Sequence, residues 1–422
     1  MILVSFGFQI LDWVMEEKPY EFLEMDHAIH VDLIGKINGV TSASKHYTQI
    51  PPAFQTTMIY SVLLAAYLER NMERKAETLL ARAVEMGLRN QVFLYNQMVH
   101  FYKGKGKISV VAALLKAMDI HAVKADLYTY NMILDLRARK GDADGMEKVW
   151  YRMKDDNNVI PDSATFAILA KGYLVAGKLE KAEKMVKKVE TGPFRRKRLV
   201  NLMLLKLYGQ LGKKDDLERI WTSVEEGQKV TIADYEAMIR SLGMVGDADR
   251  AEDIFEEMLE NGGGKNVQQY NALLSVYAQL GRIKKGENLV KKIMKASLSP
   301  NPSTYHELVL MYLKGGQEQK AMETLLKAQK VSRTSIRSRP LYASFQAALN
   351  WFAEKGDVKN AEKIIKDLKD TGYSCAYRSY IVLLKAYEKA HMSPYGFIDR
   401  IRADNVIPNQ YIRKELQKLE GT

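Results

Sequence analysis

Two clusters of basic residues give this sequence its clearest capacity for chemistry with a polyanion. The first lies within residues 187–198, where Glu190 is the only acid, and the second lies within residues 327–339, which contain no acid. Guanidinium and ammonium groups bind phosphate oxygens without reading a base sequence. A single run of charge is usually a solvated surface, and that alternative stays open for each cluster. The residues expected to contact phosphate are Lys187, Lys188, Arg195, Arg196, Lys197, Arg198, Lys330, Arg333, Arg337 and Arg339.

The overall charge agrees with a polyanionic partner. The chain has 422 residues, and its 63 Lys and Arg residues outnumber 51 Asp and Glu residues, which leaves a formal net charge of +12. Such an excess favours nucleic acid or a ribosome surface as the partner. The apolar segment that starts the chain ends at Asp12, well short of the roughly 20 residues that span a bilayer, so no membrane partner is expected.

Residues suited to catalysis or metal binding are few and badly spaced for either task. Cys375 is the single cysteine, so neither an internal disulfide nor a multi-thiolate metal site can form. Only His27 and His30 lie close together among the seven histidines, and packing is the commoner role of such a pair. The Gly-Gly-Gly-Lys segment at 262–265 lacks the first glycine and the Ser or Thr of a phosphate-binding P-loop. We therefore expect no enzyme activity, no cofactor, no metal and no small-molecule substrate.

The elements that must position functional side chains repeat along the chain. A marker residue, usually aromatic, recurs every 34 to 36 residues, and a glycine follows most markers with the same period. Two independent markers with one period indicate an array of units that contact only their neighbours. The markers are Tyr60, Tyr95, Tyr130, Phe166, Asn201, Tyr235, Tyr270 and Tyr305, and the glycines are Gly106, Gly141, Gly177, Gly212, Gly246, Gly281 and Gly316.

Each unit has the pattern of two helices joined by a short turn. In residues 127–162, apolar residues at helical spacing on both sides of Gly141 indicate two helices, because glycine tolerates the backbone angles of a tight turn. Pro161 then prevents further helix. The recurrent aromatic and Met residues are expected to form the core, together with a small residue near the start of each second helix. These small residues are Ala76, Ala182, Ala251, Ala321 and Ala361.

The residues that open and close the units separate this array from tetratricopeptide repeats, which have a period of about 34 residues and an early Trp. The dominant period here is 35, units open with sequences such as Tyr95-Asn96-Gln97-Met98, and they close with Pro161-Asp162 or Pro300-Asn301. The sequence thus resembles the P-type pentatricopeptide repeat (PPR) proteins that are abundant in plant organelles. The segment Trp13-Val14-Met15-Glu16 and the residues after it resemble a mitochondrial subgroup that includes members associated with the mitochondrial ribosome.

This resemblance implies an all-α fold, a right-handed α-solenoid of about ten two-helix PPR units. We expect an N-terminal helical cap with a degenerate repeat at residues 1–56, the PPR array at residues 57–409 and a short C-terminal capping helix at residues 410–422. Relatives in the subgroup carry a transit peptide before the matching segment. The expected location is therefore the mitochondrion, with the plastid as second choice, and the transit peptide is expected to be absent from this chain.

In PPR proteins, the residue after the first-helix marker and the last residue of the unit together read one RNA base. A side-chain amide offers a donor and an acceptor to a base edge, and the second residue orients it. The resemblance implies that Phe93 and Tyr128 stack on neighbouring bases. The alternative for each Asn is a helix-start or turn residue satisfied locally. The implied pairs are Asn96 with Asp126 and Asn131 with Asp162, which prefer uracil, and Asn271 with Asn301, which prefers a pyrimidine.

The other units depart from this pattern. Leu202 and Ile381 place an apolar side chain where a polar reader is required, and the remaining combinations match no established pair. If each good contact discriminates by ~1–3 kcal/mol, three readable bases are too few to select one transcript among many. The RNA is then either positioned by its context or recognised through shape and phosphate.

The sequence therefore predicts a non-catalytic RNA-binding protein of plant mitochondria that acts in organellar RNA metabolism or translation. Single-stranded RNA, either organellar mRNA or ribosomal RNA, is expected in a concave groove lined by the first helices. One alternative is a structural subunit of the mitochondrial ribosome that clamps ribosomal RNA through the basic loops and contacts mitochondrial ribosomal proteins. A second alternative is a protein-binding scaffold of the tetratricopeptide kind.

Overall fold

The computed structural model describes residues 22–193, 197–227, 229–332, 340–375, 377–404 and 410–420, together with residues 7, 10, 13, 17, 406 and 408. Within these residues every regular element is a helix, so the all-α prediction is confirmed. None of the helices described is long and apolar enough to cross a lipid bilayer. The chain forms two compact units, Met1–Arg195 and Arg196–Thr422.

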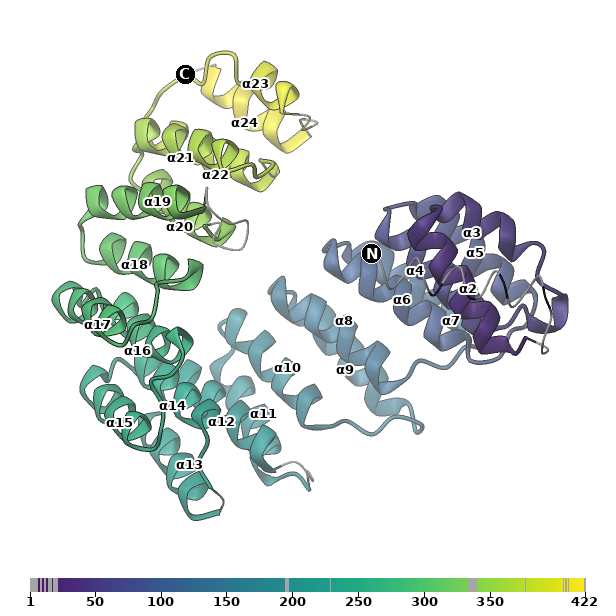
Figure 1. Cartoon of the computed structure of the whole chain (residues 1–422), viewed down its shortest axis with the longest axis horizontal. Helices are drawn as coiled ribbons and strands as arrows, with labels where there is room; N and C mark the ends of the chain where they lie inside the picture. Colours follow the sequence, from purple (N-terminus) through teal and green to yellow (C-terminus); the bar gives the residue numbers. More distant parts are fainter. Residues whose placement is uncertain are drawn as a thin grey trace. The chain divides into compact units, whose positions relative to one another are not determined.

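In its described part, the first unit has an N-terminal helix pair, which packs against α4, and four further pairs (Figure 1). Its helices are α2 (Glu24–Ile37), α3 (Val40–Tyr47), the short η1 (Pro52–Phe54), α4 (Thr57–Glu69), α5 (Glu73–Glu85), α6 (Gln91–Gly104), α7 (Ile108–Ile120), α8 (Leu127–Arg139), α9 (Ala143–Asp155), α10 (Ser163–Val175) and α11 (Leu179–Thr191).

Among the residues that the structure describes in the second unit are six helix pairs and a final helix that packs against α22. Its helices are α12 (Lys197–Leu211), α13 (Lys214–Gly227), α14 (Ile232–Val245), α15 (Ala248–Glu260), α16 (Val267–Leu280), α17 (Ile283–Lys295), α18 (Pro302–Lys314), α19 (Glu318–Ser332), α20 (Tyr342–Glu354), α21 (Val358–Asp370), α22 (Tyr377–Lys389), α23 (Phe397–Ala403) and α24 (Gln410–Glu420). The pairs from α4 to α23 agree with the predicted number of about ten two-helix repeats.

The first helices of successive pairs pack directly on one another. In the first unit this row runs through α4, α6, α8 and α10, and in the second unit it runs from α12 to α22 through the even-numbered helices. The second helices α5, α7, α9, α13, α15, α17, α19 and α21 pack mainly on their own first helix and make smaller contacts with the first helix that follows. Side chains at equivalent positions of neighbouring first helices therefore lie close together, which sets the geometry of the candidate site.

The turn inside each pair contains a residue in the left-handed conformation. Gly281 has a φ of 64°, and a Cβ atom at this position would come within 3.3 Å of the Gly315 backbone. Two turns use another residue type at the equivalent position, since Asn71 has a φ of 56° and His391 has a φ of 53°. The turn geometry explains the glycine series in the sequence. In the last pair a residue with a Cβ atom, His391, adopts this conformation, which costs free energy relative to glycine.

The core lies between the paired helices and combines Leu, Ile and Val with aromatic, Met and Ala side chains. Tyr130 on α8 and Met146 on α9 are both buried, and the five alanines expected near the starts of second helices have no exposed surface. This confirms their predicted packing role. His27 and His30 are buried as well, with ring centroids 5.0 Å from Phe54 and 4.6 Å from His46, respectively. Within the described residues, no three His, Cys, Asp or Glu side chains are grouped as metal ligands would be.

Candidate nucleic-acid interface

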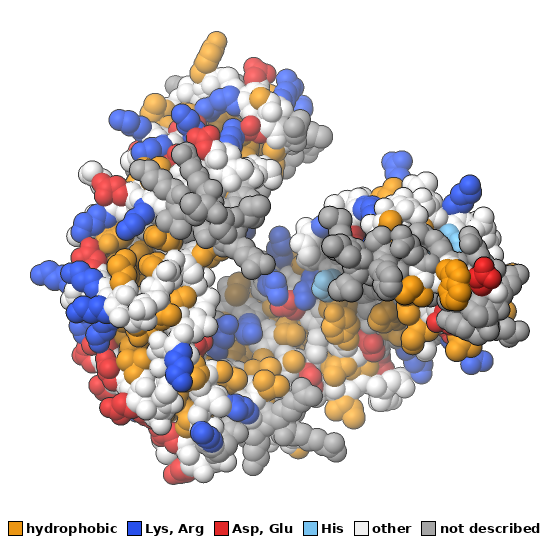
Figure 2. Space-filling view, viewed as in Figure 1, with side chains coloured by type: hydrophobic (Ala, Val, Ile, Leu, Met, Phe, Trp, Pro, Cys, Tyr) orange, Lys and Arg blue, Asp and Glu red, His pale blue; other side chains and the backbone are white. Residues whose placement is uncertain are grey.

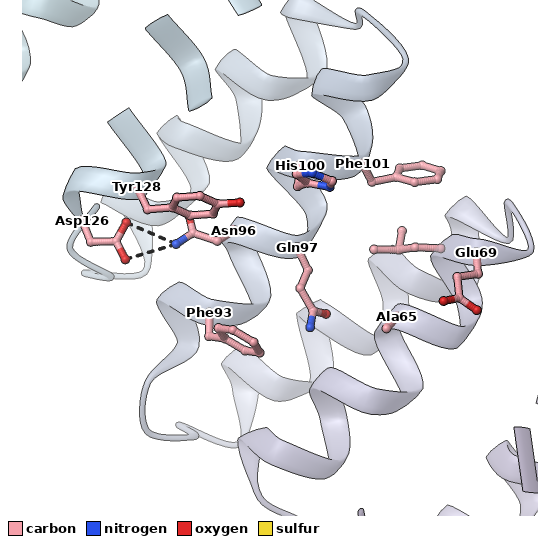
Figure 3. A pocket seen from close by; sticks show the side chains of 10 residues that line it. Ala65, Glu69, Phe93, Asn96, Gln97, His100, Phe101, Asp126 and Tyr128 are labelled. Carbon is pink, nitrogen blue, oxygen red and sulfur yellow. Dashed lines mark hydrogen bonds between the residues drawn. The ribbon is translucent and has the colours of Figure 1, made fainter. Parts of the chain in front are cut away.

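Asn96 lies on α6 and is held by two side chains at the start of α8, the next first helix. Its amide Nδ2 donates to both carboxylate oxygens of Asp126 at 3.2 Å, and its Oδ1 accepts from the Thr129 hydroxyl at 2.6 Å (Figure 3). Asp126 is the N-cap of α8 and accepts a hydrogen bond from the Thr129 backbone N–H at 2.7 Å. Helix capping therefore fixes the two partners, and the partners fix the orientation of the Asn96 amide.

This arrangement, which we call an amide triad, consists of a first-helix Asn, the N-cap of the next first helix and the Thr three positions after that N-cap. For Asn131 the Nδ2 donates at 3.4 Å and the Oδ1 accepts at 2.8 Å. For Asn271 the corresponding distances are 3.1 and 2.9 Å. The further triads are Asn131, Asp162 and Thr165 in the first unit and Asn271, Asn301 and Thr304 in the second unit.

The triads bear on the two roles considered for these residues, which are reading of an RNA base and local capping of a helix start. The local helix-start role belongs to Asp126, Asp162 and Asn301, because all three are N-caps, whereas each first Asn lies inside a helix. An Asn amide has two N–H donors and two acceptor lone pairs, and the triad uses one of each. The remaining N–H and lone pair form a donor beside an acceptor, which is complementary to the adjacent N–H and carbonyl of a uracil edge.

The three Asn residues differ in their access to a ligand. Asn131 is partly exposed and Asn96 is 6% exposed, whereas Asn271 is only 1% exposed. A base can reach the Asn271 amide only if neighbouring side chains move. The Asn271 amide is therefore the least accessible of the three.

A pocket of about 720 Å³ opens beside the Asn96 triad, between α4, α6 and the start of α8. Phe93 and Tyr128, the two predicted stacking residues, line this pocket and are 54% and 56% exposed. Asn96 lies between their rings in the view of Figure 3. His100 and Gln97 extend the lining along α6. The structure thus brings four predicted site residues, Phe93, Asn96, Asp126 and Tyr128, to one cavity.

Other first helices keep part of the triad. His306 Nδ1 lies 3.0 Å from Ser344 Oγ, and Gln346 Nε2 donates to Ser379 Oγ at 2.6 Å. The N-cap position is not conserved in chemistry, because the N-cap of α20 is the apolar Leu341. Ala376, three residues before Ser379, lies outside the described residues. The hydroxyl position was missed from the sequence, although an Asp or Asn followed three residues later by Thr is a helix-capping signal that marks it.

The structure places the predicted phosphate ligands in different surroundings. Lys187 is 66% exposed and lies 3.4 Å from Glu183, while Lys188 Nζ lies 5.3 Å from the centre of the Phe166 ring. Arg195, Arg196, Arg333, Arg337 and Arg339 lie outside the described residues, as do the side chains of Lys197 and Lys330.

Arg198 has an intramolecular partner that its sequence context did not reveal. Its Nη2 donates to Asp234 Oδ2 at 2.7 Å, and the Asp234 side chain is only 1% exposed. The same guanidinium nitrogen donates to the Thr231 hydroxyl. Because a buried carboxylate needs a cation, this charge acts first as an internal counter-ion.

Burial shifts two titrating groups in the first-helix row of the second unit. Desolvation raises the pKa of Glu307 on α18 to about 7, although Arg240 on α14 acts in the opposite direction. Desolvation also lowers the pKa of His306, the preceding residue. Both groups are therefore less charged at neutral pH than they would be in water.

Stacked helix pairs with amide triads along the first helices define a helical-repeat protein. A family model described as "Pentatricopeptide repeat domain" matches residues 113–169, 222–279 and 265–315, and one described as "PPR repeat" matches residues 164–191. A mitochondrial pentatricopeptide repeat-containing protein of Arabidopsis thaliana is 31% identical over 414 residues, which cover 98% of this chain and 68% of that protein. A second one is 30% identical over 408 residues, with coverages of 97% and 67%. The chain belongs to the pentatricopeptide repeat family.

Solved structures of this family share the fold. The crystal structure of the pentatricopeptide repeat protein PPR10 in complex with an 18-nt psaJ RNA element matches with a TM-score of 0.55 and 20% identity. The match covers 94% of this chain and 58% of that chain. The crystal structure of PPR10 from maize matches with a TM-score of 0.51 and 18% identity, over 99% of this chain and 64% of that one. The chain therefore spans less than two thirds of the PPR10 chain.

Proposed function

We propose that this protein is a non-catalytic RNA-binding repeat protein of plant mitochondria and that single-stranded RNA lies along the first-helix row of its first unit. Three findings support the proposal: the family, the mitochondrial names of the Arabidopsis relatives, and the RNA element bound by PPR10. The net charge of +12 also favours a polyanion.

The Asn96 triad is the observation that carries the proposal. Phe93 and Tyr128 present two exposed aromatic faces beside the amide, so a base can stack on them while its edge faces Asn96. In this pose the uracil N3–H donates to Asn96 Oδ1, and a neighbouring uracil carbonyl accepts from Nδ2. Asp126 and Thr129 hold the amide in the orientation that this pairing requires.

The Asn131 triad extends the same mode by one unit, so two successive uracils are the proposed recognition element. Asn271 and Asn301 are proposed as a weaker pyrimidine contact because Asn271 is almost fully buried. Lys187 and Lys188 on α11 are proposed phosphate ligands, and with them the predicted basic residues that lie outside the described residues.

Binding of short RNAs tests this assignment. Asn96→Ala should weaken binding of a uridine-rich 12-mer by about tenfold, since a good base contact is worth ~1–3 kcal/mol, and should leave binding of a cytidine-rich 12-mer nearly unchanged. Fluorescence anisotropy at fixed salt measures both affinities.

Asn350→Ala is the matched control, because Asn350 is an exposed Asn on the first helix α20 that belongs to no triad. Equal loss of affinity for both RNAs in Asn96→Ala would refute base reading at this site. Crosslinking in organelles followed by sequencing separates the ribosomal alternative, which requires ribosomal RNA fragments, from a messenger-binding role.

A further inference from the structure

The second helices carry a regular series of ion pairs between neighbouring repeats. In each case the fifth residue of one second helix is a Glu that accepts from a Lys or Arg at the third position of the next second helix. Figure 2 shows this charge alternation in the second unit, where acidic side chains over α15 lie beside basic side chains over α17. The pairs are Glu147 with Lys181 at 2.6 Å, Glu218 with Arg250 at 3.3 Å, Glu252 with Lys285 at 2.6 Å and Glu287 with Lys320 at 3.0 Å.

Between the second helices of the first unit, one acid of this series faces no cation. Glu77 is the fifth residue of α5, but the third residue of the next second helix, α7, is Val110. Glu77 accepts a hydrogen bond from the Tyr102 hydroxyl at 2.7 Å, as Glu287 does from Tyr312 at 3.1 Å. Within the described residues Glu77 has no cationic partner. The tyrosine and the acid of the pattern are thus present as Tyr102 and Glu77, and Val110 stands in the place of the cation.

The helix that lacks the cation is also unusually apolar. Lys116 and Asp119 are the only charged residues of α7, whereas the opposing α5 contains six. Ala113 and Ala117 stand where other second helices carry charged side chains such as Lys148 and Arg152. The surface of α7 thus presents small and branched apolar groups in place of solvated charges, as Ile120, 78% exposed, also illustrates.

A groove of about 370 Å³ lies between α5 and α7, with α6 as its floor. Leu80 and Val84 line one wall, and Val110 and Leu114 line the other. Glu77 and Glu85 give the α5 rim a negative charge. The floor residues Tyr95, Met98 and Tyr102 lie on the face of α6 opposite to Asn96, Gln97 and His100, so the groove is separate from the RNA pocket.

We infer that this groove binds an amphipathic helix of a partner protein, with two or three apolar side chains between α5 and α7 and a Lys or Arg paired with Glu77. The partner's cation occupies the place that Lys181, Lys285 and Lys320 occupy for their acids. Burial of apolar side chains supplies affinity, and the acidic rim supplies specificity. The inference does not depend on RNA binding, because the groove shares no residue with the Asn96 pocket.

Two synthetic helical peptides of 18 residues test the inference. Both carry Leu at i, i+3, i+4 and i+7, and the flanking positions are Lys in one and Glu in the other. We expect the Lys peptide to bind about tenfold more tightly by fluorescence anisotropy, which corresponds to ~1.4 kcal/mol. The protein's net charge of +12 favours the Glu peptide, so general electrostatics cannot produce this preference.

Val110→Lys is the decisive variant, because it restores the missing cation opposite Glu77 and narrows the groove. We expect it to weaken binding of the Lys peptide at least about tenfold, without lowering the melting temperature. Ala113→Arg, at an exposed position of the groove wall, should have the same effect on binding, and Ala296→Arg, at an exposed position of the second unit, serves as its control.

Three outcomes would overturn the inference. The first is equal binding of the two peptides, or binding of the Lys peptide that survives both groove variants. The second is self-association in sedimentation velocity that Val110→Lys abolishes, because the occupant would then be a second copy of the chain. The third is a loss of RNA affinity in Val110→Lys, because the groove would then belong to the RNA site. Loss of uridine preference in Asn96→Ala affects only the proposed function.

Discussion

At the scale of single residues, the amides of the first helices owe their direction to the helix that follows them. Asp126 caps α8 because the first turn of a helix has free N–H groups, and both of its oxygens also accept from the Asn96 amide. One capping interaction thus stabilises the fold and prepares a base-binding group. The pairing of Asn96 with Asp126 was implied by the resemblance to PPR proteins, whereas the depth of Asn271 could not be predicted, because it depends on side chains from several helices.

Charged residues were harder to assign from the sequence than amides. Arg198 belongs to a run of basic residues, yet it pairs with Asp234, which lies 36 positions later on the next first helix. A run of charge in the sequence shows the local excess of cations but not which of them meet an acid in the fold. Only the spatial neighbours decide whether a cation is free for phosphate.

Glu307 gives a prediction about the pH dependence of stability. Its folded pKa of about 7 lies above the ordinary value of 4.5, so the folded state binds the proton more tightly. The resulting stabilisation is complete below about pH 4.5 and is lost as pH rises through 7. Glu307→Gln should therefore be more stable than the wild type at pH 8 and should show a smaller loss of stability between pH 5 and 8.

Thermal unfolding at each pH measures this difference. His306, whose pKa is lowered, has the opposite sign, because its contribution is lost as pH falls below its ordinary value of 6.5. It is present in both proteins and cancels in the comparison. If the melting temperatures of the two proteins changed with pH by the same amount between pH 5 and 8, Glu307 would be solvated and the prediction would be wrong.

At the scale of helices and turns, the glycine period reports a backbone requirement. Each turn needs one residue with positive φ, and glycine adopts it without steric cost. The sequence therefore predicts where the turns lie. It does not indicate how a pair without the glycine turns, and the structure shows that His391 and Asn71 take the same conformation.

The turn at His391 gives a stability prediction. His391→Gly should stabilise the protein by about 0.5–1 kcal/mol, because the relief of left-handed strain exceeds the added flexibility of the unfolded chain. The matched control is Gly141→Ala, which places a Cβ atom on a residue with a φ of 69° and should destabilise the protein. Urea denaturation measures both changes. Destabilisation by His391→Gly would mean that the His391 side chain makes contacts worth more than the strain.

At the scale of the whole molecule, the repeat period was enough to predict an all-helical array of about ten pairs. Two helices per unit and a buried marker in each first helix follow from helical spacing and from the need to bury one face of every helix. The division at Arg195 could not be predicted in this way, because the marker series continues across it without interruption. A period describes each repeat and its neighbour, whereas the extent of a compact unit depends on all its contacts.

The central claim is that RNA bases lie against the first helices of the first unit. The most direct measurement is photocrosslinking of a uridine-rich RNA that contains 4-thiouridine, followed by mass spectrometry of the crosslinked peptides. We predict crosslinks in α6 and α8, at peptides that contain Phe93 and Tyr128, and their loss in the presence of excess unmodified RNA. Crosslinks confined to second helices such as α7 and α9 would contradict this account.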